Sequence, residues 1–323
     1  MEQRRMGRTG LKVSTLCLGT MTFGWSADDA TSFAIMDRAV GAGINFFDTA
    51  DIYSYWIKGN KGGESETIIG KWLKERAVAR HELILATKVR GPLWAGANGQ
   101  GLSRAHIVKA AEDSLRRLGT DYIDLYQAHY PDDETPLDET LAAFDQLVRD
   151  GKVRYIGASN YPAWLLMKSL WVSDVKHLTR FDCLQPHYSL LHRSEFEREL
   201  EAACIDQGIG VIPYSPLAAG FLTGKYTRAN RDPDTSRSES GLIKRLVDDD
   251  HAYTALDEVR RIAQAHDVPM AQIALAWMLH RPGITSPIIG ARTVEQLEET
   301  LGAIGVLLAP EEIASLEGLT DKF

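Results

Sequence analysis

Polar and ionisable residues stand at the ends of six apolar segments of strand length. They are Asp48, Lys88, His129, Ser159 with Asn160, Gln185, and Tyr214 with Ser215. The carboxyl ends of the strands of a barrel meet at one mouth, so these side chains are expected to lie together there. An ionised lysine in such a partly dry place is costly unless it is paired. We therefore expect an ion pair between Lys88 and Asp48, either purely structural or part of a site for proton transfer.

Tyr53 follows Asp48 closely, in the segment DTADIYSYW. It is expected on the loop that leaves the strand, from which it can fold back over the mouth. A neighbouring ammonium favours the phenolate, so we expect Lys88 to lower the pKa of Tyr53 from its ordinary value of about 10. Such a phenol can donate a proton to a carbonyl oxygen, while His129 orients the substrate oxygen or shuttles the proton. The alternative is that Tyr53 is a packed aromatic residue, as Tyr55 would be.

A second candidate site lies near the end of the chain, where Thr293 and Gln296 have the spacing of a capping box. The pattern predicts that a helix begins just after the apolar segment that ends at Gly290. Backbone N–H groups at a helix start, beside the guanidinium of Arg292, form a favourable place for a phosphate group. The plainer interpretation is an exposed arginine at the start of a surface helix.

Eight short apolar segments alternate with amphipathic segments of helical length. The apolar segments are residues 15–19, 44–48, 83–88, 122–129, 154–159, 181–185, 209–215 and 286–290. Continuously apolar strands are typical of a parallel sheet that is covered on both faces. Three helical segments have clear limits, from Ser103 to Gly119, from Thr135 to Gly151 and from Ser194 to Gly208.

Eight strand–helix units predict a (β/α)8 TIM barrel, an α/β fold that forms one domain over residues 1–323. The residues around Gly7 to Gly10 are expected to form a β-hairpin that plugs one end of the barrel. Residues 226–250 are polar and long for a connection, which is typical of a lid or a disordered loop. The alternative is a doubly wound nucleotide-binding sheet. That fold should carry G-x-G-x-x-G after the first strand, where the sequence is LGTMTFG, and the pattern G-x-x-x-x-G-K-[ST] is also absent.

The composition argues against several classes of protein. The chain has 323 residues, with 36 Lys and Arg against 44 Asp and Glu, and a net charge of −8. An acidic protein lacks the basic face that nucleic acids and anionic membranes require. No apolar run reaches the ~18 residues of a membrane span, and the start has no apolar leader, so a cytoplasmic location is expected. The three cysteines are widely spaced, which predicts neither disulfides nor a metal site. The composition is compatible with any oligomeric state.

Several segments resemble the aldo-keto reductases, in order and over nearly the whole chain. They are RRMGRTGLKVSTLCLGTMTFG, INFFDTADIY, LATK, DYIDLYQAHYPD, DGKVRYIGASNY, LQPHYSLL, VIPYSPLAAGFLTGKY and PIIGARTVEQLEE. The resemblance implies a catalytic tetrad of Asp48, Tyr53, Lys88 and His129. It also implies NADPH-dependent reduction of an aldehyde or ketone without a metal, with Tyr53 as the proton donor. The segment SPLAAGFLTGKY is similar to the branch that includes potassium-channel β subunits and aflatoxin-aldehyde reductases.

The same resemblance implies which residues hold the NADPH or NADP+ cofactor. Those at the nicotinamide end are Thr20, Met21, Asp48, Ser159, Asn160, Gln185 and Tyr214, the last of which would stack on the ring. Those at the pyrophosphate and adenosine are Ser215, Pro216, Leu217, Gly220, Leu222, Lys225, Gly290, Arg292, Gln296, Glu299 and Thr300. Thr300 stands where related enzymes commonly have an asparagine that contacts adenine, so adenine recognition is expected to be looser.

Trp25, Trp56 and Trp94 follow the first three strands, and they would line an apolar substrate pocket or else pack within their loops. Two other functions stay open on the sequence. Lys88 could form a Schiff base in a barrel-type lyase, although Asp48 should keep it protonated and Arg292 would then have no role. The protein could also be a regulatory subunit that holds NADPH and turns over slowly, as the resemblance to channel β subunits allows.

Overall fold

Eight parallel strands form the centre of the computed structural model, which describes residues 1–233 and 241–323. In hydrogen-bonding order they are β10 (Ile288–Gly290), β3 (Cys17–Gly19), β4 (Phe46–Asp48), β5 (Ile84–Val89), β6 (Ile123–Ala128), β7 (Val153–Ser159), β8 (Phe181–Gln185) and β9 (Gly210–Val211). Every residue of β5 and β6 is buried, as expected for strands that are covered on both faces. The strands overlap all eight predicted segments. β9 is the shortest, and Pro213 has no N–H with which to continue its ladder.

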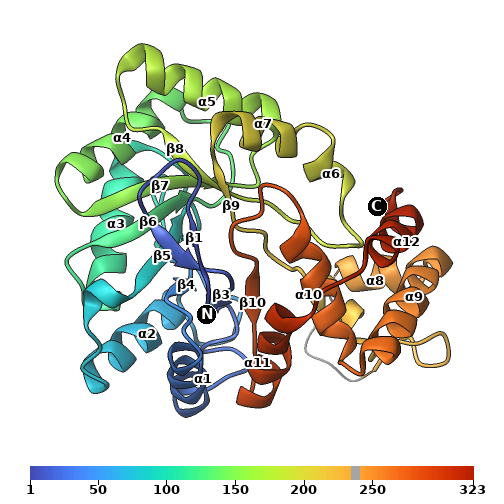
Figure 1. The fold of residues 1–323 in the computed structure, drawn as a ribbon. Helices are drawn as coiled ribbons and strands as arrows, with labels where there is room; N and C mark the ends of the chain where they lie inside the picture. The colour runs from blue at the N-terminus through green and yellow to red at the C-terminus, as the bar shows by residue number, and fades with distance from the viewer. Residues whose placement is uncertain (234–240) are drawn as a thin grey trace.

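The two outer strands of this sheet meet and close it into a barrel. Val211 of β9 lies opposite Ile284 in a parallel bridge, and its carbonyl accepts the Thr285 N–H at 2.8 Å. Further along, the Ile288 N–H of β10 donates to the Pro213 carbonyl at 2.8 Å. Figure 1 shows the strands at the centre, with the helices arranged around them. The predicted (β/α)8 barrel is confirmed.

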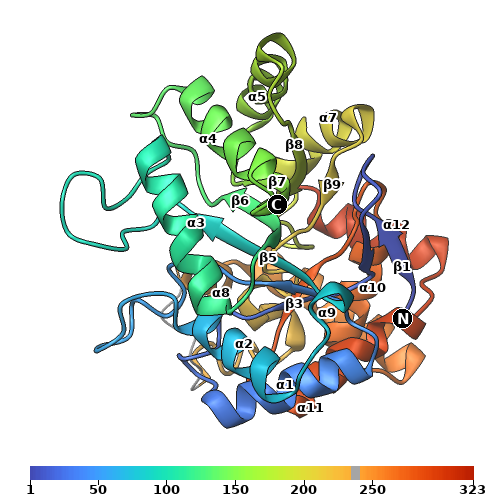
Figure 2. The ribbon, with the colours of Figure 1, turned by 90° about the vertical axis from the view of Figure 1, so that its left-hand side faces the viewer.

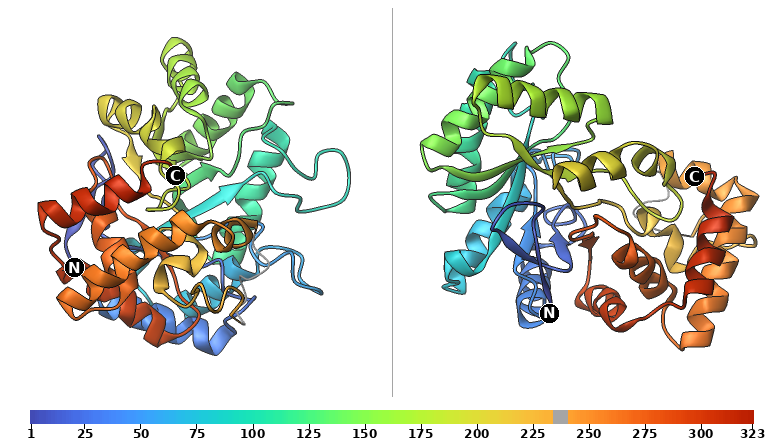
Figure 3. Two further views of the ribbon diagram at one scale, coloured as in Figure 1. Left: turned by 90° about the vertical axis from the view of Figure 1, so that its right-hand side faces the viewer. Right: turned by 45° about the horizontal axis from the view of Figure 1, so that its top comes forward.

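The helices surround the sheet. They are α1 (Asp29–Gly41), α2 (Glu64–Glu75), α3 (Arg104–Leu118), α4 (Leu137–Arg149), α5 (Ala163–Lys176), α6 (Ser194–Glu197), α7 (Leu200–Gln207), α8 (Gly241–Val247), α9 (Asp250–His266), α10 (Met270–His280), α11 (Val294–Leu301) and α12 (Pro310–Thr320). The Ser103 side chain accepts the His106 N–H at the start of α3, and Gly119 ends this helix with a φ of +64°, as the sequence predicts. The C-terminal helices α9, α10 and α12 gather on one side of the barrel (Figure 3).

A hairpin of β1 (Gln3–Arg5) and β2 (Lys12–Ser14) covers the end of the barrel from which the strands start (Figure 2). Met6 and Val13 are fully buried there, in a cluster with residues that point into the barrel. Gly7 has a φ of +52°, and a Cβ on it would lie 2.3 Å from a backbone carbonyl oxygen just before β9. Only glycine fits this close approach. The predicted hairpin plug is confirmed.

The prediction of one continuous helix from Ser194 to Gly208 is wrong. The structure has two short helices there, α6 and α7, because the backbone at Glu199 leaves the helical conformation with a φ of −141°. Phe196 of α6 and Leu200 of α7 are both buried. The break lets both short helices direct apolar side chains to the core.

The long connection over residues 226–250 is not wholly a loop, because α8 forms within it. Ile243 and Leu246 of α8 are buried, and this burial stabilises the helix in a segment that reads as polar overall. The part of the predicted lid at 234–240 lies outside the described residues. In the ranges 1–233 and 241–323, no helix has both the length and the apolar character that are needed to cross a bilayer.

Candidate active site

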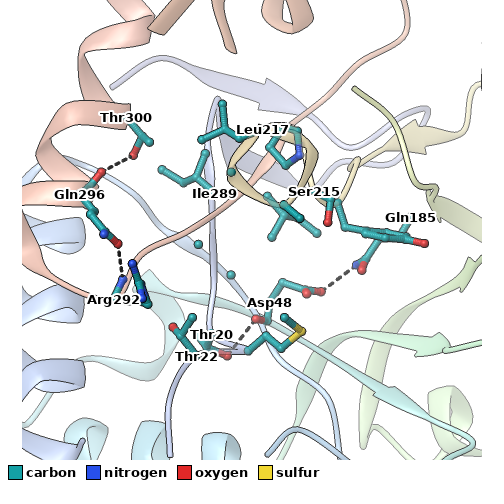
Figure 4. Close-up of a pocket in the computed structure, with 18 of the residues that line it drawn as sticks. Thr20, Thr22, Asp48, Gln185, Ser215, Leu217, Ile289, Arg292, Gln296 and Thr300 are labelled. Carbon is teal, nitrogen blue, oxygen red and sulfur yellow. Dashed lines mark hydrogen bonds between the residues drawn. The ribbon is translucent and has the colours of Figure 1, made fainter. Parts of the chain in front are cut away.

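A cavity of about 400 Å³ opens at the carboxyl ends of the barrel strands. It extends from Asp48 and Gln185 on one side to Gln296 and Thr300 on the other (Figure 4). The predicted site residues that line it are Thr20, Met21, Asp48, Tyr53, His129, Ser159, Asn160, Gln185, Tyr214, Ser215, Pro216, Leu217, Gly220, Lys225, Gly290, Arg292, Gln296, Glu299 and Thr300. The predicted residues that lie in the described chain but outside this lining are Lys88, Leu222, Trp25, Trp56 and Trp94.

Lys88, near the end of β5, is held beneath the cavity by three oxygen atoms. Its Nζ donates to Asp48 Oδ2 at 2.6 Å, to the Thr49 carbonyl at 2.8 Å and to the Tyr53 hydroxyl at 2.9 Å. Lys88 and Asp48 are buried, and the expected ion pair is present. Burial alone would lower the pKa of Lys88, but the adjacent Asp48 and Tyr53 raise it above its ordinary value. Lys88 is therefore an ammonium whose three N–H bonds are all in use.

Tyr53 reaches this ion pair from the loop after β4. The centroid of its ring lies 4.8 Å from Lys88 Nζ. The expected lowering of its pKa is wrong, because burial raises the pKa of Tyr53 above its ordinary value despite the opposing effect of the Lys88 charge. Tyr53 is thus a protonated phenol at neutral pH. The spacing of residues along the sequence shows the neighbouring charge but not the dry surroundings.

His129 lies beside Tyr53, with the ring centroids 6.1 Å apart and the planes at 74°. Burial lowers the pKa of His129 to about 3, and the positive charges of Lys88 and Arg90 act in the same direction. The imidazole is therefore neutral at pH 7 and can orient a bound oxygen through a ring N–H. The His129 carbonyl accepts from Asn160 Nδ2 at 3.0 Å, which links it to the next wall of the cavity.

Gln127 completes the polar floor of the site and is not among the residues predicted from the sequence. It is fully buried on β6 and donates to Asp48 Oδ1 at 3.2 Å. Gln185 donates to the same oxygen at 2.8 Å and to Gln127 Oε1 at 3.2 Å. A signal was present, since Gln127 interrupts an apolar strand, and alternation along the strand places it on the same side as Leu125 and His129.

A chain of hydrogen bonds forms the wall beside Gln185. The Ser159 hydroxyl donates to the Gln185 carbonyl at 2.9 Å, and Asn160 Nδ2 donates to Ser159 Oγ at 3.0 Å. The Tyr214 hydroxyl donates to Asn160 Oδ1 at 2.8 Å. The ring of Tyr214 stacks on His187, with centroids 5.0 Å apart and planes at 9°. The structure thus brings the residues predicted for the carboxamide and the ring onto one wall.

Residues 215–225 form a tight loop along the cavity. Ser215 and Gly220 have φ of +54° and +92°. A Cβ on Gly220 would lie 2.8 Å from Lys225 Nζ, so the glycine leaves room for this ammonium. The Leu222 side chain is fully buried in the main hydrophobic core and does not line the cavity, so the predicted part of Leu222 in the cofactor loop stays a prediction.

The start of α11 forms the far side of the cavity. Thr293 accepts the Gln296 N–H at 3.3 Å, as the capping box predicts, and Gln296 Oε1 accepts the Arg292 N–H at 3.0 Å (Figure 4). The reciprocal bond of the box therefore reaches one residue further back than its usual partner. The Thr300 hydroxyl donates to the Leu297 carbonyl at 2.9 Å, so it is used within its own helix.

The three tryptophans predicted for substrate binding lie in two places. Trp56 contacts Tyr53 with centroids 6.4 Å apart, and Trp25 meets Trp56 edge to face at 5.7 Å. Trp94 contacts His106 of α3, with the ring centroids 4.7 Å apart and the planes tilted by 37°, and it lines a separate hollow. Its ring is anchored on this helix, which is why its position after the third strand does not bring it to the cavity.

Known proteins resemble this chain along almost its full length. A sequence profile of the Aldo/keto reductase family matches residues 15–321. The oxidoreductase YrpG of Bacillus subtilis is 41% identical over 323 residues, which cover 99% of this chain and 96% of that protein. Versiconal hemiacetal acetate reductase of Aspergillus parasiticus is 34% identical over 340 residues, covering 98% of this chain and 96% of that protein. Protein tas of Escherichia coli is 35% identical over 340 residues, with coverage of 99% and 97%.

These similarities extend over the segments that build the barrel and the cavity. The finer resemblance, to channel β subunits and aflatoxin-aldehyde reductases, stays a prediction. The profile match and the full-length relatives show that this chain belongs to the aldo/keto reductase family of oxidoreductases.

Proposed function

We propose that this protein reduces an aldehyde or ketone to an alcohol with NADPH, and that Tyr53 donates the proton. The observation that carries the proposal is the hydrogen bond of 2.9 Å between the Tyr53 hydroxyl and the Lys88 ammonium. Tyr53 lines the cavity, whereas Lys88 lies beneath it and is fixed by Asp48 at 2.6 Å. A protonated phenol beside a fixed positive charge is suited to proton donation, because the charge stabilises the phenolate that forms.

The residues around the cavity fit a nicotinamide cofactor. Gln185 uses its amide N–H bonds on Asp48 and Gln127, which leaves its Oε1 to accept from a carboxamide. On the opposite side, the start of α11 and the cations of Arg292 and Lys225 favour phosphate groups, which supports NADPH over NADH. The cofactor, when bound, would supply the hydride that reduces the carbonyl carbon.

Each side chain of the tetrad has its own role in the proposed proton transfer. Tyr53 donates its proton to the carbonyl oxygen, and Lys88 stabilises the resulting phenolate. Asp48 keeps Lys88 charged and fixes its direction. His129 is neutral, so it orients the substrate oxygen through a ring N–H and does not act as the acid. Asp48 and Lys88 are buried, and the exclusion of water from this ion pair strengthens its electrostatic interactions.

The carbonyl substrate would bind against Tyr53, beside the pair formed by Trp25 and Trp56. Trp56 contacts both Tyr53 and Trp25, so aromatic surface adjoins the proton donor. Such a wall favours an apolar or aromatic substituent on the carbonyl compound.

A Schiff-base lyase fits the site less well than a reductase. A lysine nucleophile must be an uncharged amine, whereas the neighbours of Lys88 raise its pKa and occupy all three of its N–H bonds. A slow regulatory subunit would use the same cofactor residues. The complete set of hydrogen bonds around Lys88, one of which goes to Tyr53, favours catalysis over that alternative.

The test is the oxidation of NADPH in the presence of a panel of aldehydes, ketones and sugars, with NADH measured in parallel. We expect turnover of at least one carbonyl compound and a preference for NADPH. A protein that binds neither cofactor would contradict the proposal. Binding of NADPH without turnover of any carbonyl compound would support the regulatory subunit, and a lysine adduct trapped by borohydride would support the lyase.

A further inference from the structure

Gln127 lies between the tetrad and the residues that are proposed to hold the carboxamide. It is fully buried, it does not line the cavity within the described chain, and its hydrogen bonds go to Asp48 and Gln185. We propose that Gln127 is a positioning residue that, together with Asp48, fixes which end of the Gln185 amide faces the cavity and thereby favours a cofactor with a carboxamide. The inference rests on the proposed function, because it concerns the ligand of the same cavity.

The orientation of both amides follows from the charge on Asp48. In its ion pair with Lys88, Asp48 is a carboxylate and can only accept hydrogen bonds. Its Oδ2 accepts from Lys88, and its Oδ1 accepts from Gln127 and from Gln185. Both glutamines must therefore turn their nitrogen toward Oδ1. The oxygen of Gln127 then points away from Asp48 and accepts the second N–H of Gln185 at 3.2 Å.

This second acceptor, Gln127 Oε1, opposes rotation of the Gln185 amide. If its amide were reversed, Gln185 Oε1 would face two oxygen atoms, Asp48 Oδ1 and Gln127 Oε1, and two hydrogen bonds would be lost in a buried place. The Gln185 oxygen is thus presented to the ligand. It can accept from the NH₂ of a carboxamide, but it gains nothing from an acetyl group and repels a carboxylate.

The backbone beside Gln127 makes room for this arrangement. Gln127 on β6 is paired with Gly157 on β7, which in turn is paired with Cys183 on β8. A Cβ on Gly157 would lie 3.2 Å from Gln127 Cγ and 3.0 Å from the Cys183 carbonyl oxygen. The absent side chain therefore lets Gln127 extend past β7 to reach Gln185 on the strand beyond.

The experiment compares the binding of three oxidised cofactors by fluorescence titration. They are NADP+, its 3-acetylpyridine analogue, which lacks the NH₂, and its nicotinic acid analogue, which carries a carboxylate. The wild-type protein should prefer NADP+ over the acetyl analogue by roughly two- to tenfold, the range expected for one neutral hydrogen bond. It should discriminate more strongly against the carboxylate.

Gln127→Met keeps the length of the side chain but removes its hydrogen bonds. Because Asp48 Oδ1 still accepts from Gln185, the preference for NADP+ over the acetyl analogue should become measurably smaller without disappearing. Gln127→Glu is the conservative variant. A buried glutamic acid beside ionised Asp48 stays protonated, so it can donate to Asp48, accept from Gln185 and retain the preference. Gly157→Ala should weaken the preference by displacing Gln127 without changing any amide.

A merely structural role for Gln127 would change all three dissociation constants together and leave their ratios unaltered, and that result would overturn the inference alone. If Gln127→Met does not fold, Gly157→Ala and the wild-type ratios decide. A wild-type protein that binds the carboxylate analogue as well as NADP+ would also overturn the inference. Failure of the wild type to bind NADP+ at all would instead overturn the proposed function, and this inference with it.

Discussion

The two ends of the cavity differ in how much water reaches them. The tetrad end consists of Asp48, Tyr53, Lys88 and His129, with Gln127 behind them. There the ion pair and Gln127 are buried and held by hydrogen bonds of 2.6 to 3.2 Å. At the phosphate end, formed by Lys225, Arg292 and the start of α11, the two cations are only half-buried. Proton transfer requires fixed charges in a dry place, whereas binding of a phosphate tolerates water because the charge of the ligand is large.

This contrast implies that similar contacts have different energies at the two ends. In a buried site, removal of one partner leaves an uncompensated charge, which is strongly destabilising. At the half-buried phosphate end, water and salt compensate for part of the lost electrostatic energy. Substitutions at the two ends therefore test whether the energies differ.

The largest effect is expected for Tyr53→Phe, which removes the proposed proton donor. Carbonyl reduction should fall by about 10²- to 10⁴-fold, the usual contribution of a positioned acid. Cofactor affinity should be nearly unchanged, because the ring remains. The matched control is Tyr55→Phe on the same loop, where the side chain is exposed and contacts Trp56. A kcat for Tyr53→Phe near that of the wild type would remove Tyr53 from the mechanism.

The next effect is on stability and concerns Lys88→Met. Reduction should be abolished, and Asp48 would be left buried without its counter-ion, which should cost about 3–5 kcal/mol of the free energy of unfolding at pH 7. The control is Lys71→Met, because the Lys71–Asp29 ion pair is also short, at 2.7 Å, but its partners are half exposed. That variant should lose less than about 1 kcal/mol. Urea unfolding curves of equal midpoint for the two variants would contradict the contrast.

At the phosphate end, Arg292→Ala should weaken NADPH binding by about one to two decades, since a charge-assisted hydrogen bond contributes roughly 1.5–3 kcal/mol. NADH lacks the adenosine phosphate, so its affinity should barely change, and kcat at saturating NADPH should be kept. Arg149→Ala serves as the control, since Arg149 is an exposed arginine paired with Asp145 on α4. Equal losses for both cofactors would place Arg292 away from the phosphate.

The smallest expected effect is that of pH on kcat/KM for reduction. The pKa of His129 is lowered to about 3, so this ring stays neutral above that value. The pKa of Tyr53 is raised above 10, so the phenol stays protonated below that value. The rate should therefore be flat from about pH 5 to pH 9, where neither group titrates. A midpoint between pH 6 and pH 8 that disappears in His129→Gln would show that the tetrad end is wetter than described.

Local signals predicted much of the fold. Ser103, Gly119 and Thr293 act on the N–H and carbonyl groups of their own helices, so their roles can be inferred from the sequence without a tertiary structure. The break at Glu199 and the helix α8 depend on burial of apolar side chains against distant parts of the chain. Such tertiary packing overrides local composition, which is why these two elements differ from the prediction.

In the site, too, some features follow from the sequence and others depend on tertiary packing. The meeting of Asp48, Tyr53, Lys88 and His129 follows from the positions of strand ends in a barrel. The raised pKa of Tyr53 could not be anticipated, because desolvation depends on the surrounding atoms rather than on one charged neighbour. Of the two interpretations given for Trp94, packing is the one that fits the structure, because the direction of a long loop depends on what its side chains contact, here His106.

The hairpin of β1 and β2 also has a kinetic consequence. With Met6 and Val13 filling the opposite end of the barrel, ligands can exchange only at the face where the strands finish. On the proposed placement of the cofactor, the cofactor and the carbonyl compound would therefore both enter and leave through this one face.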